Sequence, residues 1–126
     1  MSELLRYDER GLVPVVVQDK ETGQVLMLAY MDAEALEATQ RTGKLYLRSR
    51  SRGVLWLKGE TSGHYQLVDE IRMNCEGNSL LALVRPQGPA CHDGYATCFY
   101  RRLQPDGGTQ IVAERLFDPE EIYGAR

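Results

Sequence analysis

The chain has 126 residues, about the size of one domain, and 43% of them are hydrophobic, which is enough to form a core. Its net charge of -3 argues against a surface adapted as a whole to nucleic acid or anionic lipid. The opening residues are charged and lack the apolar core of a signal peptide, and the longest apolar run, 25–31, is too short to span a bilayer. We therefore expect one domain, 1–126, in the cytoplasm, without a membrane partner.

The first elements predicted along the chain are a hairpin and a helix. Residues 12–18 and 25–30 are rich in β-branched and apolar side chains and are joined by the polar segment DKETGQ, which predicts a β-hairpin. A helix is expected next, because Asp32 can cap it, residues 33–42 include good helix formers and Gly43 can end it.

The remaining elements are predicted to be mostly short strands. A second short helix is expected near Pro119. Many short strands with one or two helices indicate a mainly β, closed or nearly closed structure, because closure removes exposed strand edges. The further strands are expected at 44–50, 53–59, 65–73, 79–85 and 97–103.

The three cysteines, Cys75, Cys91 and Cys98, cannot all pair within one chain, and a reducing compartment disfavours disulfides. The stretch GPACHDGYATC places two of them seven positions apart, with His92 and Asp93 beside the first. This is not the spacing of a zinc knuckle, but three thiolate ligands would leave a fourth zinc position for water, as in catalytic sites. The plainer alternative is that the cysteines are buried core residues and His92 is a hydrogen-bonded structural residue.

The stretch LYLRSRSRGVLWLKGETSGHYQ combines cations with hydroxyl groups and glycines. If it is a strand, Arg48, Arg50 and Arg52 share one face. Guanidinium groups, hydroxyls and the free backbone amides of a glycine-containing turn are what phosphate oxygens need. A solvated charged strand is the plainer interpretation, and Tyr46 and Trp56 also permit stacking on the bases of single-stranded RNA or DNA.

Three stretches, GLVPVVVQDKETGQVLMLAYMDAEAL, SRSRGVLWLKGETSGHYQ and ACHDGYATCFYR, resemble signature segments of the phosphoribosyl-AMP cyclohydrolase family. The resemblance runs from about Gly11 to Arg102 in the family's order, and it implies a β pseudobarrel capped by a helix. It also implies a homodimer with a shared catalytic zinc ion, bound by Cys75 of one chain and by Cys91 and Cys98 of the other. The implied reaction is hydrolysis of the N1–C6 bond of 1-(5-phosphoribosyl)-AMP, which opens the adenine ring in histidine biosynthesis.

The chemistry of this substrate fits such a site. N1 carries a ribosyl group, so C6 is electron-poor, and a zinc ion would activate water for attack there. Three thiolates donate much charge to the metal and blunt its Lewis acidity, so a neighbouring base should help, and His92 is the candidate. The residues expected to hold the nucleotide and its two phosphate groups are Ser49, Arg50, Arg52, Trp56, Lys58, Thr61 and Ser62.

The chain departs from the family pattern at NCEGN. The family typically reads Asp-Cys-Asp-x-Asp, with three aspartates holding magnesium, whereas the corresponding residues here are Asn74, Glu76 and Asn78. Magnesium requires hard oxygen ligands in near-octahedral geometry, so we expect a degenerate site, whose amides coordinate weakly or bind substrate directly. Asp93 stands where the family usually has threonine, and its carboxylate could orient His92 or raise its pKa.

These departures leave alternatives open. The chain could be the ordinary enzyme, or a divergent paralogue using the same zinc-assisted hydrolysis on another purine-like or amidine-bearing ring. A third alternative is a non-catalytic zinc module that binds RNA through the basic strand 48–58. The acidic net charge and the lack of a fourth sulfur ligand count against it.

Overall fold

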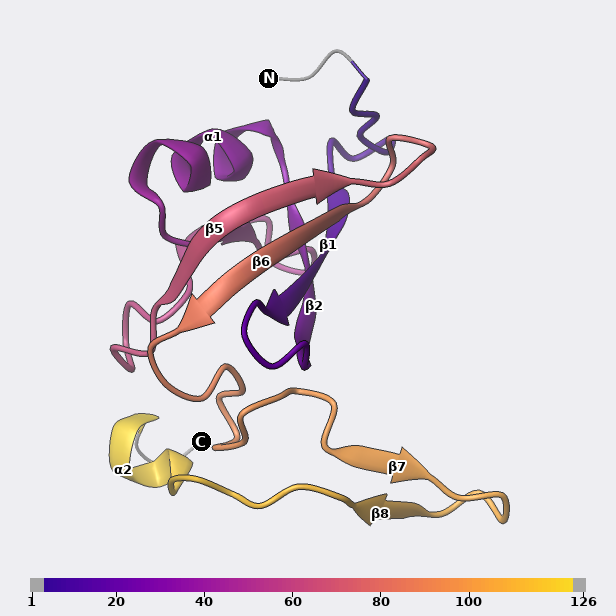
Figure 1. Ribbon diagram of the computed structural model, residues 1–126, viewed down its shortest axis with the longest axis vertical. Helices are drawn as coiled ribbons and strands as arrows, with labels where there is room; N and C mark the ends of the chain where they lie inside the picture. The colour runs from indigo at the N-terminus through magenta and orange to yellow at the C-terminus, as the bar shows by residue number, and fades with distance from the viewer. Residues whose placement is uncertain (1–3, 124–126) are drawn as a thin grey trace.

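The computed structural model describes residues 4–123, and residues 1–3 and 124–126 of the predicted domain lie outside it. The described part is mainly β with two short helices, as predicted (Figure 1). None of its helices is long and apolar enough to cross a bilayer. The elements are β1 (Val13–Asp19), β2 (Val25–Met31), α1 (Ala33–Thr42), β3 (Tyr46–Arg48), β4 (Leu55–Leu57), β5 (Gln66–Met73), β6 (Leu80–Pro86), β7 (Arg101–Leu103), β8 (Thr109–Ile111) and α2 (Pro119–Tyr123).

A four-stranded sheet in the order β2-β1-β6-β5 forms the centre of the molecule. β1 pairs antiparallel with β2, which confirms the predicted hairpin, and parallel with β6, while β5 and β6 are antiparallel. Val13, Val15 and Val17 of β1 are fully buried and alternate with less buried residues, as expected for one face of a strand against the core. Leu36 of α1 joins the same core cluster, so the helix packs on the sheet (Figure 1).

The structure confirms the predicted helix with its caps. Oδ1 of Asp32 accepts a hydrogen bond of 2.8 Å from the backbone nitrogen of Ala35, which satisfies one of the free amides of the first turn. Gly43 ends the helix at a φ of 77°, and its backbone N–H donates to the carbonyl of Thr39. The second short helix also begins where it was predicted, at Pro119.

The predicted strand 44–50 is shorter in the structure, and the prediction that Arg48, Arg50 and Arg52 share one strand face is wrong. Only Arg48 belongs to β3, where its guanidinium pairs with Asp32 at 2.8 Å. The chain then turns, and the N–H of Gly53 donates to the carbonyl of Ser49 at 2.8 Å. Gly53 adopts a φ of 65°, which β-strand geometry excludes and glycine tolerates.

The predicted strand 97–103 also shortens, to β7 alone. The backbone N–H of Cys98 donates to the carbonyl of Leu26 at 2.7 Å, and Thr97 Oγ1 donates to the carbonyl of Val25 at 2.7 Å, so this segment is held against β2. Strand β8 was not predicted, although the residues Asp-Gly-Gly before it are a hairpin signal. β7 and β8 form a hairpin that projects from the rest of the molecule (Figure 1).

The two-stranded sheet β3–β4 continues the main sheet past β5. Lys44 and Leu67 form an isolated antiparallel bridge, and the N–H of Leu45 donates to the carbonyl of Gln66 at 3.0 Å. The N–H of Lys58 in turn donates to the carbonyl of Leu45 at 3.0 Å. The edge of β5 is therefore covered by the segment that leads from α1 into β3.

Candidate functional site

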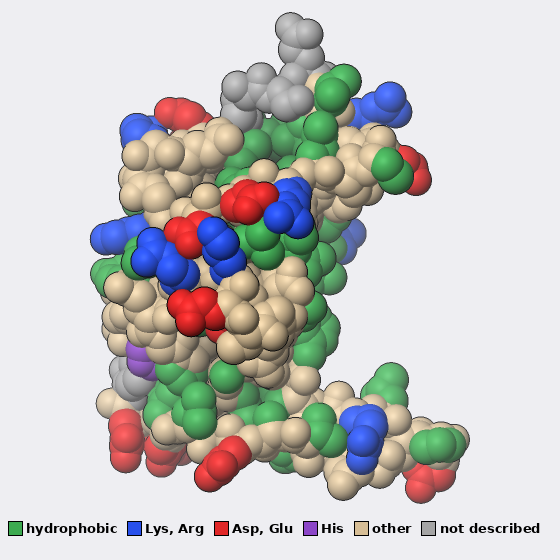
Figure 2. All heavy atoms as spheres, in the orientation of Figure 1, with side chains coloured by type: hydrophobic (Ala, Val, Ile, Leu, Met, Phe, Trp, Pro, Cys, Tyr) green, Lys and Arg blue, Asp and Glu red, His purple; other side chains and the backbone are tan. Residues whose placement is uncertain are grey.

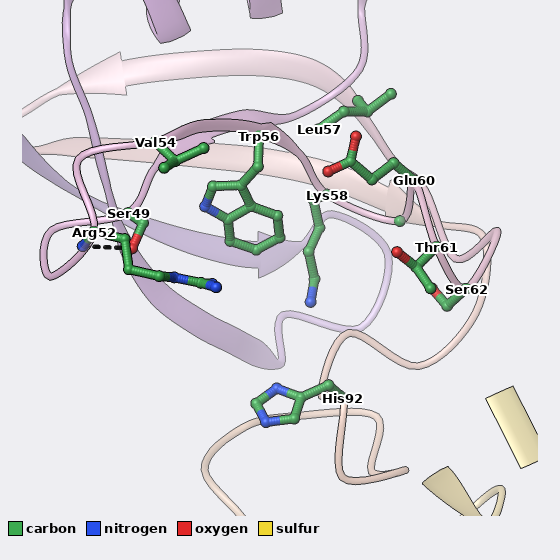
Figure 3. Close-up of a pocket in the computed structure, with 11 residues that line it drawn as sticks. Ser49, Arg52, Val54, Trp56, Leu57, Lys58, Glu60, Thr61, Ser62 and His92 are labelled. Atoms are coloured by element: carbon green, nitrogen blue, oxygen red, sulfur yellow. Dashed lines mark hydrogen bonds between the residues drawn. The ribbon is translucent and has the colours of Figure 1, made fainter. Parts of the chain in front are cut away.

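A cavity of about 690 Å³ lies beside β4 and contains most of the predicted substrate-binding residues (Figure 3). Its lining brings together the turn after β3, the strand β4, the loop after β4 and one residue from the cysteine-containing segment. Among the predicted residues, only Arg50 is missing from the lining. The lining residues are Ser49, Arg52, Val54, Trp56, Leu57, Lys58, Gly59, Glu60, Thr61, Ser62 and His92.

One wall of the cavity is formed by the turn after β3. Ser49 Oγ accepts a hydrogen bond of 3.3 Å from the backbone nitrogen of Arg52, and the guanidinium of Arg52 extends beneath Trp56 (Figure 3). No carboxylate of the described residues pairs with Arg52, so its charge is available to a ligand. Arg50 instead donates to the hydroxyl of Tyr30 at 3.0 Å and stacks over its ring, outside the cavity. Of the two arginines predicted to hold phosphate groups, Arg52 therefore lines the cavity and Arg50 does not.

The opposite wall is the loop that carries Thr61 and Ser62. The N–H of Gly63 closes this loop on the carbonyl of Gly59 at 2.7 Å. A Cβ on Gly59 would lie 2.6 Å from the backbone of His64, so only glycine fits that position. Two hydroxyls on a tight, glycine-bounded loop suit an anion such as a phosphate group.

Lys58 lies between these walls and is only 8% exposed. Its ammonium is 5.5 Å from the ring centroid of Trp56 and points toward His92 (Figure 3). Burial lowers the pKa of Lys58, and the nearby thiols of Cys98 and Cys91 act in the opposite direction. Lys58 was predicted from the sequence to bind a phosphate group, and the structure places it both in the lining of the cavity and beside the thiols.

Cys91 and Cys98 form a thiol pair next to Lys58. Cys91 is buried and Cys98 half-buried, and their side chains are close enough to hydrogen-bond. Burial, and next the charge of Cys91, raises the pKa of Cys98 to about 12. Cys91 Sγ also accepts a hydrogen bond of 3.4 Å from the backbone nitrogen of Asp93. Two adjacent sulfurs with a neighbouring cation suit a soft metal ion such as zinc, whose binding would displace the thiol proton.

Cys75 is exposed, unlike the buried Cys91 and the half-buried Cys98. It lies in the turn between β5 and β6, where Met73 pairs with Leu80. The segment that carries the thiol pair leaves the other end of β6, after Pro86, and a seven-residue strand spans roughly 20 Å. One chain therefore does not bring the three predicted zinc ligands together. Within the described part of the chain, no group of three His, Cys, Asp or Glu side chains could hold a metal ion.

His92 is exposed at the edge of the cavity, facing Lys58 and Trp56 (Figure 3). Its Nε2 lies 3.7 Å from Oδ1 of Asp93. The other carboxylate oxygen of Asp93 accepts a hydrogen bond of 2.8 Å from the hydroxyl of Tyr100, and this bond raises the pKa of Tyr100. Tyr100 was not singled out from the sequence, because tyrosine at a strand start is common and the contact forms only in the folded loop.

The residues expected to form a degenerate magnesium site do not fit magnesium. The side chains of Asn74 and Asn78 are hydrogen-bonded to each other and to the turn backbone, and Glu76 is the only carboxylate of the motif. Magnesium needs several hard oxygen ligands around it, and the turn offers one carboxylate. No step of the chemistry is therefore assigned to magnesium at this turn.

Similarity to known proteins agrees with this geometry. Residues 27–100 match the family model for phosphoribosyl-AMP cyclohydrolase. A phosphoribosyl-AMP cyclohydrolase of Pelotomaculum thermopropionicum is 52% identical over 97% of this chain and 95% of its own. Proteins with the same name from Chlorobium phaeovibrioides and Natronomonas pharaonis are 48% and 52% identical, over 98% of this chain and 90% and 99% of theirs.

Proposed function

The chain belongs to the phosphoribosyl-AMP cyclohydrolase family, and we propose that it hydrolyses the N1–C6 bond of 1-(5-phosphoribosyl)-AMP in histidine biosynthesis. One observation carries the proposal beyond the family match. The cavity holds an aromatic ring, Trp56, between an arginine wall and a hydroxyl-bearing glycine loop, with His92 facing it. This arrangement suits a flat base that carries a phosphate group on each side.

Each wall of the cavity contacts a different part of the proposed substrate. One phosphate group lies against Arg52 and Ser49, where a guanidinium can donate two parallel hydrogen bonds. The other lies on the loop of Thr61 and Ser62. The base stacks on Trp56, whose ring supplies a large apolar face. Stacking of this kind does not select among the hydrogen-bonding groups on the edge of the base.

Zinc is the metal that the donor atoms favour. We assign it to Cys91 and Cys98 of one chain with Cys75 of a second copy, because thiolates bind zinc and Cys75 lies at the far end of β6 in its own chain. When bound, zinc supplies the Lewis acid that activates water for attack on C6. Lys58 offsets the negative charge of the thiolates beside it. His92 accepts a proton at Nδ1, since its Nε2 faces Asp93.

A homodimer is part of the proposal, because one chain lacks the third ligand. The β7–β8 hairpin supports it, since a two-stranded hairpin alone is only marginally stable in water and this one exposes Leu103, Ile111 and Val112. Figure 2 shows the hairpin extending from the body of the molecule, with hydrophobic side chains along the hollow between them. The bridge from Lys44 to Leu67 supports the pseudobarrel expected from the family.

RNA binding through the segment 48–58 has less support. Arg48 is paired with Asp32 and Glu34, and Arg50 is stacked on Tyr30. The face of β5 and β6 seen in Figure 2 mixes basic and acidic side chains, through pairs such as Arg72 with Glu70. Such a mixed surface does not attract a phosphate backbone strongly.

The deciding experiment measures turnover of 1-(5-phosphoribosyl)-AMP and zinc content on the same protein samples. We expect turnover, about one zinc ion per chain, and loss of both in the variants Cys75→Ser, Cys91→Ser and Cys98→Ser. Zinc without turnover of this substrate would favour a paralogue that acts on another ring. Unchanged zinc content in Cys75→Ser would rule out the proposed site in which three thiolates from two chains bind zinc.

A further inference from the structure

The turn between β5 and β6 is closed by hydrogen bonds between two asparagine side chains. Asn74 Oδ1 accepts from the backbone nitrogens of Asn78 at 2.9 Å and Ser79 at 3.1 Å. Its Nδ2 donates to Oδ1 of Asn78 at 2.6 Å. The backbone amides can only donate, so the oxygen of Asn74 must face them and its nitrogen must face Asn78. We call the side-chain bonds of Asn74 and Asn78 the amide clamp.

The amide clamp leaves little for a cation to bind. Both lone pairs of Asn74 Oδ1 accept backbone hydrogen bonds, and one lone pair of Asn78 Oδ1 accepts from Asn74. The amide nitrogens carry hydrogens toward any ligand and cannot coordinate. Glu76 is exposed and would contribute one carboxylate on a flexible stem. The hydrogen bond across the turn thus joins the two positions that a divalent cation would otherwise have to bridge.

The clamp also fixes the backbone on both sides of Cys75. The N–H of Asn74 donates to the carbonyl of Ser79, and the N–H of Gly77 donates to the carbonyl of Asn74, each at 3.1 Å. The N–H of Arg6 donates to the carbonyl of Gly77 at 2.6 Å, which ties the amino-terminal segment to the turn. The thiol is therefore exposed at the tip of a hydrogen-bonded turn rather than on a free loop.

We propose that the amide clamp positions Cys75 in place of a divalent cation, so that this chain presents its third zinc ligand to a second copy without magnesium. The inference rests on the proposed function for the role of the thiol, and on the hydrogen bonds of the turn for the clamp itself. Asn74 and Asn78 are positioning residues: they act through the turn that carries the ligand.

Three variants distinguish the effect of losing the amide clamp from the effect of changing a single side chain. Asn78→Asp keeps the donor of Asn74 and an accepting oxygen. Asn74→Asp keeps an oxygen for the backbone amides, and the amide of Asn78 can rotate to donate to it. The double variant Asn74→Asp with Asn78→Asp has two carboxylates and no donor, so the two side chains repel unless a cation lies between them.

Amide hydrogen exchange at Gly77, Asn78 and Ser79 reports the order of the turn. The rate at which zinc is transferred from the protein to a chelating dye reports how tightly the protein binds the metal. We expect wild type and both single variants to be unaffected by millimolar magnesium. The double variant should exchange and lose zinc roughly tenfold faster, because it loses a hydrogen bond and gains like charges. Magnesium should reverse both changes in the double variant.

Two results would overturn the proposal. One is slower exchange of the wild-type turn on addition of magnesium, which needs no variant to fold. The other is a double variant that behaves like the single ones. Failure of the proposed zinc site would look different: Cys75→Ser would release zinc at the wild-type rate, while the exchange measurement would still report the clamp.

Discussion

The hydroxyl of Tyr100 donates a hydrogen bond of 2.8 Å to Oδ2 of Asp93, whose other oxygen faces His92 at 3.7 Å. Tyr100 thereby fixes the carboxylate that orients the proposed base. We expect Tyr100→Phe to lower kcat about tenfold with KM little changed, because groups that orient a reacting residue act mainly on the chemical step. Steady-state kinetics over a range of substrate concentrations measures both constants.

Tyr95 provides the matched control for this prediction. Its ring stacks on that of Tyr100 with 3.8 Å between centroids, so Phe at either position keeps the stack. Tyr95→Phe removes a hydroxyl that is not bonded to Asp93 and should leave kcat near the wild-type value. Equal losses in the two variants would mean that the hydroxyl of Tyr100 acts through packing and not through Asp93.

Arg52 and Arg50 are two positions apart and should respond differently to truncation. Arg52 lines the cavity, so Arg52→Ala should raise KM roughly tenfold or more with a smaller effect on kcat, since it removes a charge-assisted contact to a phosphate group. Arg50 stacks on Tyr30 outside the cavity, so Arg50→Ala should cost about 0.5–1 kcal/mol of stability and leave KM unchanged. Kinetics together with urea unfolding of both variants provides the comparison. A larger rise in KM for Arg50→Ala than for Arg52→Ala would show that Arg50, and not Arg52, contacts the phosphate group.

The parts of this fold that the sequence predicted depend on residues close together in the chain. The helix after Asp32 was predicted with its bounds, because its cap and its terminal glycine are local signals. The end of β3 at Arg48 was not predicted, because the guanidinium of this residue pairs with Asp32, sixteen positions away, and the chain turns directly after it. Local patterns say nothing about such pairs.

The candidate site divides in the same way. Residue types and their order indicated that Trp56, Thr61 and Ser62 belong to one site, and the structure brings them to one cavity. The position of Lys58 beside the thiols required the folded chain, because Cys91 is 33 positions further on. The separation of Cys75 from the thiol pair also depends on the fold. Cys75 lies in the hairpin turn before β6 and the thiol pair follows the end of β6, so this extended strand separates them.

Asp8 should make folding stability depend on pH in the acid range. Its Oδ1 accepts hydrogen bonds from the backbone nitrogens of Leu12 at 2.9 Å and Arg10 at 2.8 Å. The bond from Leu12 has the larger effect, and both bonds lower the pKa of Asp8. The ionised form is thus favoured in the folded state, so the stabilisation is present above the unfolded pKa of about 4 and is lost as pH falls through the lower folded value.

The test is urea unfolding of wild type and Asp8→Asn between pH 7 and pH 3. The stability advantage of wild type should shrink as the pH falls below about 4. Glu9→Gln, which removes the carboxylate next along the chain, is the matched control. Loss of a bound metal at low pH would weaken all three proteins alike, and the difference between them isolates Asp8. A constant difference across this pH range would contradict the prediction.

The β7–β8 hairpin should contribute to dimer formation through one of its two faces. Leu103 pairs with Thr109 and Arg101 with Ile111, so Leu103 and Ile111 share a face, and they are 81% and 57% exposed. Burying one leucine side chain contributes about 1.5–3 kcal/mol, so Leu103→Asp should weaken the dimer roughly tenfold or more. Sedimentation velocity over a dilution series measures the dissociation constant.

Gln110 is the matched control, because it lies on the opposite face of the same hairpin and is hydrogen-bonded to Arg102 across the strands at 2.7 Å. Gln110→Asp introduces the same charge on that face and keeps an acceptor for Arg102, so the dimer should persist. Because the zinc site is proposed to need two chains, zinc content should fall on dilution in Leu103→Asp and stay constant in Gln110→Asp. If both variants dimerise as wild type does, the exposed leucine does not belong to the interface. If both dissociate alike, charge on the hairpin and not burial of its apolar face controls assembly.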